Sequence, residues 1–207
     1  MLLSDVFTEE AKVRPLFEEP SDASVRQDPW SGPQGFMLGG MSLPTKSELG
    51  EQYFDAAYLL LESIKSNRWE DYKLVNPALY LFRHALELQI KALLGASAKT
   101  HDLAALADQL DSKALAQDGQ RAPPWIIARL KEFAAVDPGS TAFRYAQTYS
   151  RELRRDVGVD GEVYVSLLHL QRAMLALYAA LTGRLPPVAA AHPLPLADAP
   201  IDHDDEA

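Results

Sequence analysis

The sequence contains no cysteine among its 207 residues. Disulfides, thiolate nucleophiles and cysteine-based zinc or iron–sulfur sites are therefore excluded, and stability must come from packing. The first ten residues lack a basic start and a sustained apolar run, which predicts that there is no secretory signal. Since no stretch is long and apolar enough to span a bilayer, we expect a cytoplasmic protein without a membrane partner.

The sequence also lacks the common enzyme motifs. His84, His101 and His169 fall on three separate predicted helices without a His-Glu-x-x-His pattern, so no metal site and no cofactor are expected. No Gly-x-Ser-x-Gly elbow occurs. Residues 40–47 approach a phosphate-binding loop, but Thr45 replaces its second glycine and no buried strand precedes it. Nucleotide hydrolysis is therefore not expected.

The net charge of −9 is unevenly distributed along the chain. Residues 1–45 carry 3 basic and 7 acidic residues, residues 185–207 carry none and 5, and the body between them carries 17 of each. A neutral body neither indicates nor excludes nucleic acid, because binding requires only a local basic patch.

The two ends of the chain differ in composition from the body. Residues 1–44 are rich in proline and glycine and are predicted to form an irregular N-terminal arm. Its Trp30, Phe36 and Met37 either anchor it on the body or a second subunit, or belong to a partly disordered leader. Residues 185–207 form a Pro/Ala-rich acidic tail that we expect to be disordered.

The segment between them, 45–184, reads as a series of helices. Cap and stop signals predict a first helix from Thr45 to Lys65 and a second from Asn76 to Leu94, with Pro77 in its first turn and Gly95 at its exit. Thr100 caps a third helix, and a fourth runs from Pro123/Pro124 to a stop before Asp137. The last helix runs from Val163 to Leu181, between a cap at Asp160 and a stop at Gly183. Residues 142–146 and 157–159 are read as two short extended pieces. These patterns predict a mainly α fold, an up-and-down bundle of four to five helices.

Polar residues form one arc of the helix that ends at Gly95. Arg83, Glu87 and Lys91 follow each other at i, i+4 and i+8, with His84 alongside. This arc is either a solvated face with paired charges or an interaction face.

A second polar concentration lies between the fourth and last helices, where Tyr145 and Tyr149 alternate with arginines at 144, 151, 154 and 155. Guanidinium groups and aromatic rings can hold phosphate and stack on a base. Glu152 and Asp156 interrupt the cluster, so ion pairing with the helices is the alternative.

Several of these elements together resemble a known family. His84, Glu87 and Lys91-Ala-Leu93, followed by the His101-Asp-Leu103 helix start, are similar to the pairing in HEPN domains, and the 137–140 and 143–145 segments are similar to uncharacterised bacterial HEPN-like proteins. The resemblance covers roughly residues 47–183. It implies a helical bundle that pairs as a homodimer. Many members are metal-independent endoribonucleases of toxin–antitoxin or defence systems, and some accompany a nucleotidyltransferase.

The chain departs from the nuclease members of that family. Their motif is an arginine followed by histidine after four to six residues, and no arginine here is so placed. His169 precedes Arg172 in the reverse order on the last helix, where these two are the candidates for a non-standard catalytic pair. The alternative is that they are satisfied polar residues at a bundle seam.

The sequence therefore favours a non-catalytic HEPN-like interaction or ligand-binding module in a bacterial toxin–antitoxin, stress or phage-defence setting. The residues expected to form its surface are Arg83, His84, Glu87, Arg144 and Tyr145. The expected partners are a second copy, a nucleotidyltransferase or antitoxin, and RNA or a nucleotide. The alternative is a metal-independent endoribonuclease that uses His169 and Arg172, or His84 and Arg83, at a dimer cleft.

Overall fold

A computed structural model describes residues 8–15, 43–95, 98–145, 148–150, 154–157 and 163–191. The chain divides into two units, Met1–Leu43 and Pro44–Ala207. In the first unit the structure describes the short helix α1, Glu9–Val13, while the predicted anchors Trp30, Phe36 and Met37 lie outside the described residues. The second unit contains the remaining elements, and they confirm a mainly α fold.

Helix α3, Lys46–Lys65, begins and ends where the sequence predicts. The Thr45 hydroxyl accepts a hydrogen bond from the Glu48 N–H at 3.2 Å, and the Glu48 carboxylate accepts one from the Thr45 N–H at 2.7 Å. This reciprocal capping box satisfies two backbone donors that the first turn leaves without partners. After the helix, Asn67 adopts a φ of 53°, a left-handed conformation that asparagine tolerates, and the chain reverses into α4.

Helix α4, Asp71–Leu94, begins before the predicted start at Asn76, so that Pro77 lies inside it. The prediction was wrong because Pro77 removes only one hydrogen bond, near the start of the helix, whereas the additional turn packs Leu74 against the core. The predicted exit is confirmed, since Gly95 has a φ of 80° and its N–H bonds to the Lys91 carbonyl at 3.0 Å.

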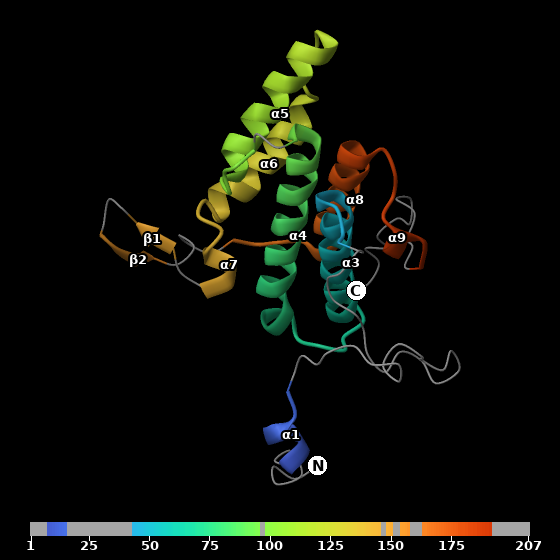
Figure 1. Ribbon diagram of the computed structural model, residues 1–207, viewed down its shortest axis with the longest axis vertical. Coiled ribbons are helices and arrows are strands. Elements are labelled where there is room, and N and C mark those ends of the chain that lie inside the picture. The colour runs from blue at the N-terminus through green and yellow to red at the C-terminus, as the bar shows by residue number, and fades with distance from the viewer. Residues whose placement is uncertain are drawn as a thin grey trace, which may run out of the picture. The chain divides into compact units, whose positions relative to one another are not determined.

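Helices α5, Leu103–Asp118, and α6, Pro124–Val136, lie side by side (Figure 1). Asp102, rather than the predicted Thr100, caps α5, because its carboxylate accepts the N–H groups of Ala104 and Ala105 at 2.9 and 3.2 Å. The Thr100 hydroxyl instead accepts the Asp102 N–H at 3.0 Å. Both predicted limits of α6 are confirmed, since the helix starts at Pro124 and ends before Asp137.

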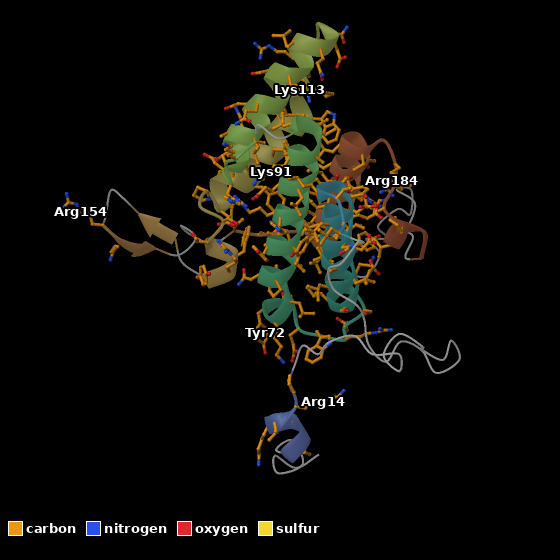
Figure 2. The ribbon with its side chains drawn as sticks, in the orientation of Figure 1. Arg14, Tyr72, Lys91, Lys113, Arg154 and Arg184 are labelled. Atoms are coloured by element: carbon orange, nitrogen blue, oxygen red, sulfur yellow. The ribbon has the colours of Figure 1, made fainter. Side chains whose placement is uncertain are left out.

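The segment after α6 contains a short helix and a hairpin. Residues Ala142–Tyr145 form helix α7 instead of the predicted extended piece. Strands β1, Thr148–Ser150, and β2, Arg155–Val157, pair antiparallel with Thr148 opposite Val157. Arg154, with a φ of 50°, lies at the turn end of this hairpin (Figure 2).

Helix α8, Leu167–Thr182, starts later than predicted. Ser166 is its N-cap, since its hydroxyl accepts the His169 N–H at 3.4 Å, and residues 163–166 are not helical. The predicted cap Asp160 lies outside the described residues. The stop at Gly183 is confirmed by its left-handed φ of 74°.

The predicted tail needs a correction at its beginning. Residues Pro187–Ala191 form helix α9, which lies beside α3. Its Val188 side chain belongs to the buried apolar core. Residues 192–207 lie outside the described residues. The body of the protein therefore extends to at least Ala191.

The core lies where α3, α4 and α8 meet, and α4 also packs against α5 (Figure 1). The Phe54 ring of α3 contacts Phe82 of α4 edge-on, with ring centroids 5.1 Å apart, and Tyr178 of α8 at 4.7 Å. Aromatic pairs at such distances add to the free energy gained from burial. Helices α4 and α8 also contact each other directly, as an up-and-down bundle requires. No described helix is long and apolar enough to cross a membrane.

Gly50 allows α3 and α4 to approach each other closely. A Cβ at this position would lie 2.9 Å from Nε2 of Gln89 and 3.3 Å from the Ala85 carbonyl oxygen. Gln89 has little freedom to move, because it accepts from the Ser47 hydroxyl and donates to the Ser47 carbonyl, each at 2.9 Å.

Gly50→Ala is therefore expected to destabilise the protein by about 1–2 kcal/mol, since overpacking outweighs the better helix propensity of alanine. Urea unfolding measures the free energy of unfolding. In a Gln89→Ala background the same change is expected to be neutral or stabilising, and an equal loss in both backgrounds would contradict the clash.

Asp55 of α3 lies in an acidic environment next to α9. Burial, followed by the nearby Glu51 carboxylate, raises the pKa of Asp55, against the opposing effects of the Val188 N–H and Arg184. Glu51 itself accepts the Tyr178 hydroxyl at 2.7 Å and pairs with Arg184, which Figure 2 shows between α8 and α9. One Asp55 oxygen is buried without a hydrogen-bond partner.

Because the folded-state pKa of Asp55 is raised, its contribution to stability is complete below the unfolded pKa and is lost as pH rises through the folded one. Asp55→Asn is expected to gain stability relative to the parent as pH rises, with a difference in slope of at most about 1.4 kcal/mol per pH unit. Unfolding free energies between pH 4 and pH 8 test this, and parallel profiles would contradict it.

Candidate functional site

The polar arc of α4 is buried, not solvated. Arg83 is 0% exposed, Glu87 1% and Lys91 8%, so the expectation of a solvated face is wrong for these three residues. Buried charges require partners, because removing an ion from water costs several kcal/mol. The partners come from α4 itself and from two loops.

The Arg83 guanidinium joins three segments of the chain. It donates to the Glu87 carboxylate at 3.2 Å and to the His101 carbonyl at 2.9 Å. Its Nε donates to the Asp137 carbonyl at 3.3 Å and lies 3.3 Å from the Asp137 carboxylate oxygen Oδ2. The Oδ2 contact is ionic, since this oxygen accepts no hydrogen bond. Arg83 thus fixes the chain before α5 and the chain after α6 on α4.

Glu87 completes a network of Arg83, Glu87, Lys91, His101 and Asp137, which we call the buried network because all of its side chains are buried except that of His101, which is 75% exposed. Its Oε1 lies 2.8 Å from both Lys91 Nζ and His101 Nδ1. Burial alone would raise the pKa of Glu87, but the hydrogen bonds from Lys91 and His101 outweigh it and lower the pKa below its usual value. Glu87 therefore stabilises the fold at neutral pH, and this contribution is lost as pH falls through its folded pKa.

Asp137 connects the buried network to α7 at the surface. Its Oδ1 accepts the N–H groups of Thr141 and Ala142 at 2.7 and 2.9 Å, which caps α7. A carboxylate at this position satisfies donors that a first turn leaves open. Since Asp137 is held by Arg83, the buried network sets where α7 presents Arg144 and Tyr145.

Five side chains form a ring array on this surface, namely Tyr53 of α3, Tyr80 and His84 of α4, and Arg144 and Tyr145 of α7. The Tyr53 ring meets His84 edge-on at 4.6 Å, and Tyr80 lies parallel to His84, with 7° between the planes at 6.0 Å. The Arg144 guanidinium carbon lies 5.6 Å from the Tyr80 ring centre and 5.2 Å from that of Tyr145. From His84 the consecutive contacts thus run to the Tyr80 ring, then to the Arg144 guanidinium, and then to the Tyr145 ring.

The two ends of the ring array differ in exposure. Tyr53, Tyr80 and His84 are partly buried, whereas Arg144 is exposed and Tyr145 is 67% exposed. Burial lowers the pKa of His84, with Glu87 opposing and Lys91, Arg83 and His101 adding to the effect, so its imidazole is uncharged at neutral pH. The positive charge of the array is thus carried by Arg144, beside the exposed face of Tyr145.

The predicted site residues are therefore divided by the structure. Arg83 and Glu87 are interior residues that position α7, while His84, Arg144 and Tyr145 belong to the ring array. The pair His169 and Arg172 lies elsewhere, on the exposed side of α8. Arg154 and Arg155 are exposed on the hairpin, and Arg151 lies outside the described residues.

Sequence reasoning missed four residues of these two clusters, Tyr53, Tyr80, His101 and Asp137. His101 and Asp137 stood in segments singled out for their resemblance to a family, but nothing in the sequence indicates that both face Arg83. Tyr80 stands four residues before His84, the helical spacing for a contact.

A metal centre finds no support in the described ranges, which contain no group of three or more histidine and acidic side chains placed to hold an ion. Comparison with family models found no matching family, and comparisons with curated proteins and with solved structures found no match either. The resemblance to HEPN domains therefore stays a prediction, and function has to be argued from the geometry.

Arg83→Met is expected to destabilise the protein by about 3–5 kcal/mol, because it leaves Glu87 and Asp137 buried without their cation. Chemical unfolding measures the loss. The matched control is Arg129→Met, since Arg129 pairs with Glu132 at 2.7 Å on the surface and is expected to contribute at most about 1 kcal/mol. Equal effects of the two changes would contradict a structural role for the buried network.

Proposed function

We propose that this chain is a HEPN-like module that binds a ligand without transforming it, and that the ring array is its binding surface. The ligand class that fits the array is a nucleotide or single-stranded RNA. The observation that carries the proposal is the exposed Tyr145 ring with the Arg144 guanidinium beside it, backed by Tyr80 and His84.

The array combines the two interactions that such a ligand requires. A base can stack on the exposed Tyr145 ring, and every base offers a flat face for this. Arg144 can donate several hydrogen bonds to a phosphate while its plane remains against the tyrosines. Further cations are available in the same region of the chain, because Arg154 and Arg155 are exposed on the hairpin.

Ordering of the array before binding supports affinity. Arg144 is held at both sides, by its stacking between Tyr80 and Tyr145 and by a hydrogen bond from its Nε to the Ser140 carbonyl. A side chain that is already fixed loses little conformational entropy when a ligand arrives. The buried network also fixes the position of α7 before a ligand binds, because Asp137 caps this helix.

The chemistry of the cluster favours binding over catalysis. The carboxylate of Glu87 is fully engaged by Arg83, Lys91 and His101, so it is not available as a general base. Arg83 is fully buried and cannot reach a phosphate in this conformation. The pairing of His84 with Arg83 as a nuclease site is therefore disfavoured, while His169 and Arg172, exposed on α8, carry the alternative of an endoribonuclease at a dimer cleft.

The biological setting follows from the family resemblance. We place the module in a bacterial toxin–antitoxin, stress or phage-defence system, as a homodimer whose protein partner is a nucleotidyltransferase or an antitoxin. The family resemblance supports this placement, and identification of co-purifying proteins from the native host tests it.

The experiment is a fluorescence anisotropy titration of a short labelled oligouridine with the purified chain in EDTA, with AMP as competitor. Tyr145→Ala is expected to weaken binding about five-fold or more, because stacking of a base on an aromatic ring contributes about 1–3 kcal/mol. Arg144→Ala is expected to weaken it as well and to reduce its salt dependence.

Tyr72→Ala is the matched control, since Tyr72 is 69% exposed on the first turn of α4, as Figure 2 shows, outside the ring array. Equal effects of Tyr72→Ala and Tyr145→Ala, or no saturable binding, would overturn the assignment. RNA cleavage in EDTA that disappears in His169→Ala would establish the endoribonuclease alternative instead.

A further inference from the structure

His101 is the one member of the buried network whose side chain is open to solvent, at 75% exposure. Its Nδ1 lies 2.8 Å from Oε1 of Glu87, and its backbone carbonyl accepts the Arg83 guanidinium at 2.9 Å. Both the ring and the backbone of His101 are therefore held by buried side chains. An imidazole that is fixed at one nitrogen and exposed presents its second nitrogen to a ligand.

The partner of Nδ1 determines what the second nitrogen can do. The pKa of Glu87 lies below its usual value, so its carboxylate is ionised at neutral pH and can only accept hydrogen bonds. Nδ1 of His101 therefore carries a proton in both charge states of the ring. Nε2 is the nitrogen that gains or loses a proton, so it accepts a hydrogen bond in the neutral ring and donates one in the charged ring.

His101 lies close to the ring array. Burial lowers the pKa of His84, a member of the array, and the charge of His101 adds to this effect, so the two imidazoles are within electrostatic range of each other. The Arg83 guanidinium also binds the carbonyls of both His101 and Asp137, and Asp137 caps α7. The chain at His101 is thus held beside the chain that leads into the helix of Arg144.

A proton on Nε2 adds an uncompensated positive charge to this surface. The charged and titratable groups near His101 are Arg83, His84, Glu87 and Lys91 of α4, Asp137 after α6, and Lys99 and Asp102 of its own segment. Their three cations balance their three carboxylates, and His84 is uncharged at neutral pH. The additional charge therefore complements an anion such as a phosphate.

We infer that His101 is a second phosphate contact of the nucleotide surface, and that its Nε2–H donates to a phosphate only when the imidazole is charged. This inference rests on the proposed function, in which the ring array stacks a base and Arg144 makes the first phosphate contact. Because the ligand binds the charged imidazole more tightly, affinity decreases as pH rises through the range in which imidazoles lose their charge.

The anisotropy titration is repeated at pH 6 and pH 8 with a rhodamine-labelled oligouridine, whose diester phosphates keep their charge over this range. The full chain is expected to bind about five-fold more tightly at pH 6, the upper range for one exposed ion pair. His101→Asn keeps an N–H near the position of Nδ1 for Glu87 but cannot take up a proton. It is expected to bind equally at both pH values, with about the affinity of the parent at pH 8.

Lys99→Asn is the matched control, because it removes an exposed cation from the same segment. It is expected to retain the five-fold difference between the two pH values, since lysine is not a group that titrates in this range. A five-fold difference that persists in His101→Asn would contradict the inference and assign the proton to another histidine.

A second readout uses the unaltered chain. NMR follows the imidazole proton signals through a pH titration, and saturating oligouridine is expected to move the midpoint of the His101 signal upward by about 0.7 pH unit, because linkage converts the five-fold factor into this shift. An unmoved midpoint, or equal affinity of the parent at both pH values, would overturn the role of His101. The nucleotide surface would still stand if binding depended on Tyr145. Loss of that dependence would remove the nucleotide surface and the role of His101 together.

Discussion

The arrangement of the loops before α5 and after α6 depends on one buried cation, Arg83. Arg83 is completely removed from solvent, and its donors can be satisfied only if the His101 carbonyl, the Glu87 carboxylate and Asp137 all lie around it. Two of these partners come from loops that the helices alone leave undetermined. A misplaced loop would leave a buried charge unpaired, so the arginine selects one arrangement of both loops.

The interior network is balanced in charge, with Arg83 and Lys91 against Glu87 and Asp137. Burying such a network contributes less to stability than a well-packed apolar core of the same size, because desolvation offsets the Coulomb attraction. Its effect lies in specificity. The carboxylate of Asp137 receives Arg83 on one side and the first turn of α7 on the other, so an interior ion pair determines the position of surface residues.

Local signals predicted a large part of the fold but little of the site. The limits of α3 and α6 and the exits at Gly95 and Gly183 follow from caps, prolines and glycines, which act within a few residues. The start of α4 was missed because packing of Leu74 overrides the local Asn-Pro signal. The polar arc was misread because periodicity shows that Arg83, Glu87 and Lys91 share a face, not what covers it. Only the three-dimensional course of the loops shows that His101 and Asp137 cover it.

The four residues of α7 connect the interior of the protein to the ring array. Phe143 is buried, while Arg144 and Tyr145 contribute to the array. The position of the array therefore depends on one short helix whose first turn is capped by a single carboxylate. Because Arg83 holds that carboxylate, a change in the interior that moves Asp137 is expected to move Arg144 and Tyr145 as well, although neither contacts Arg83.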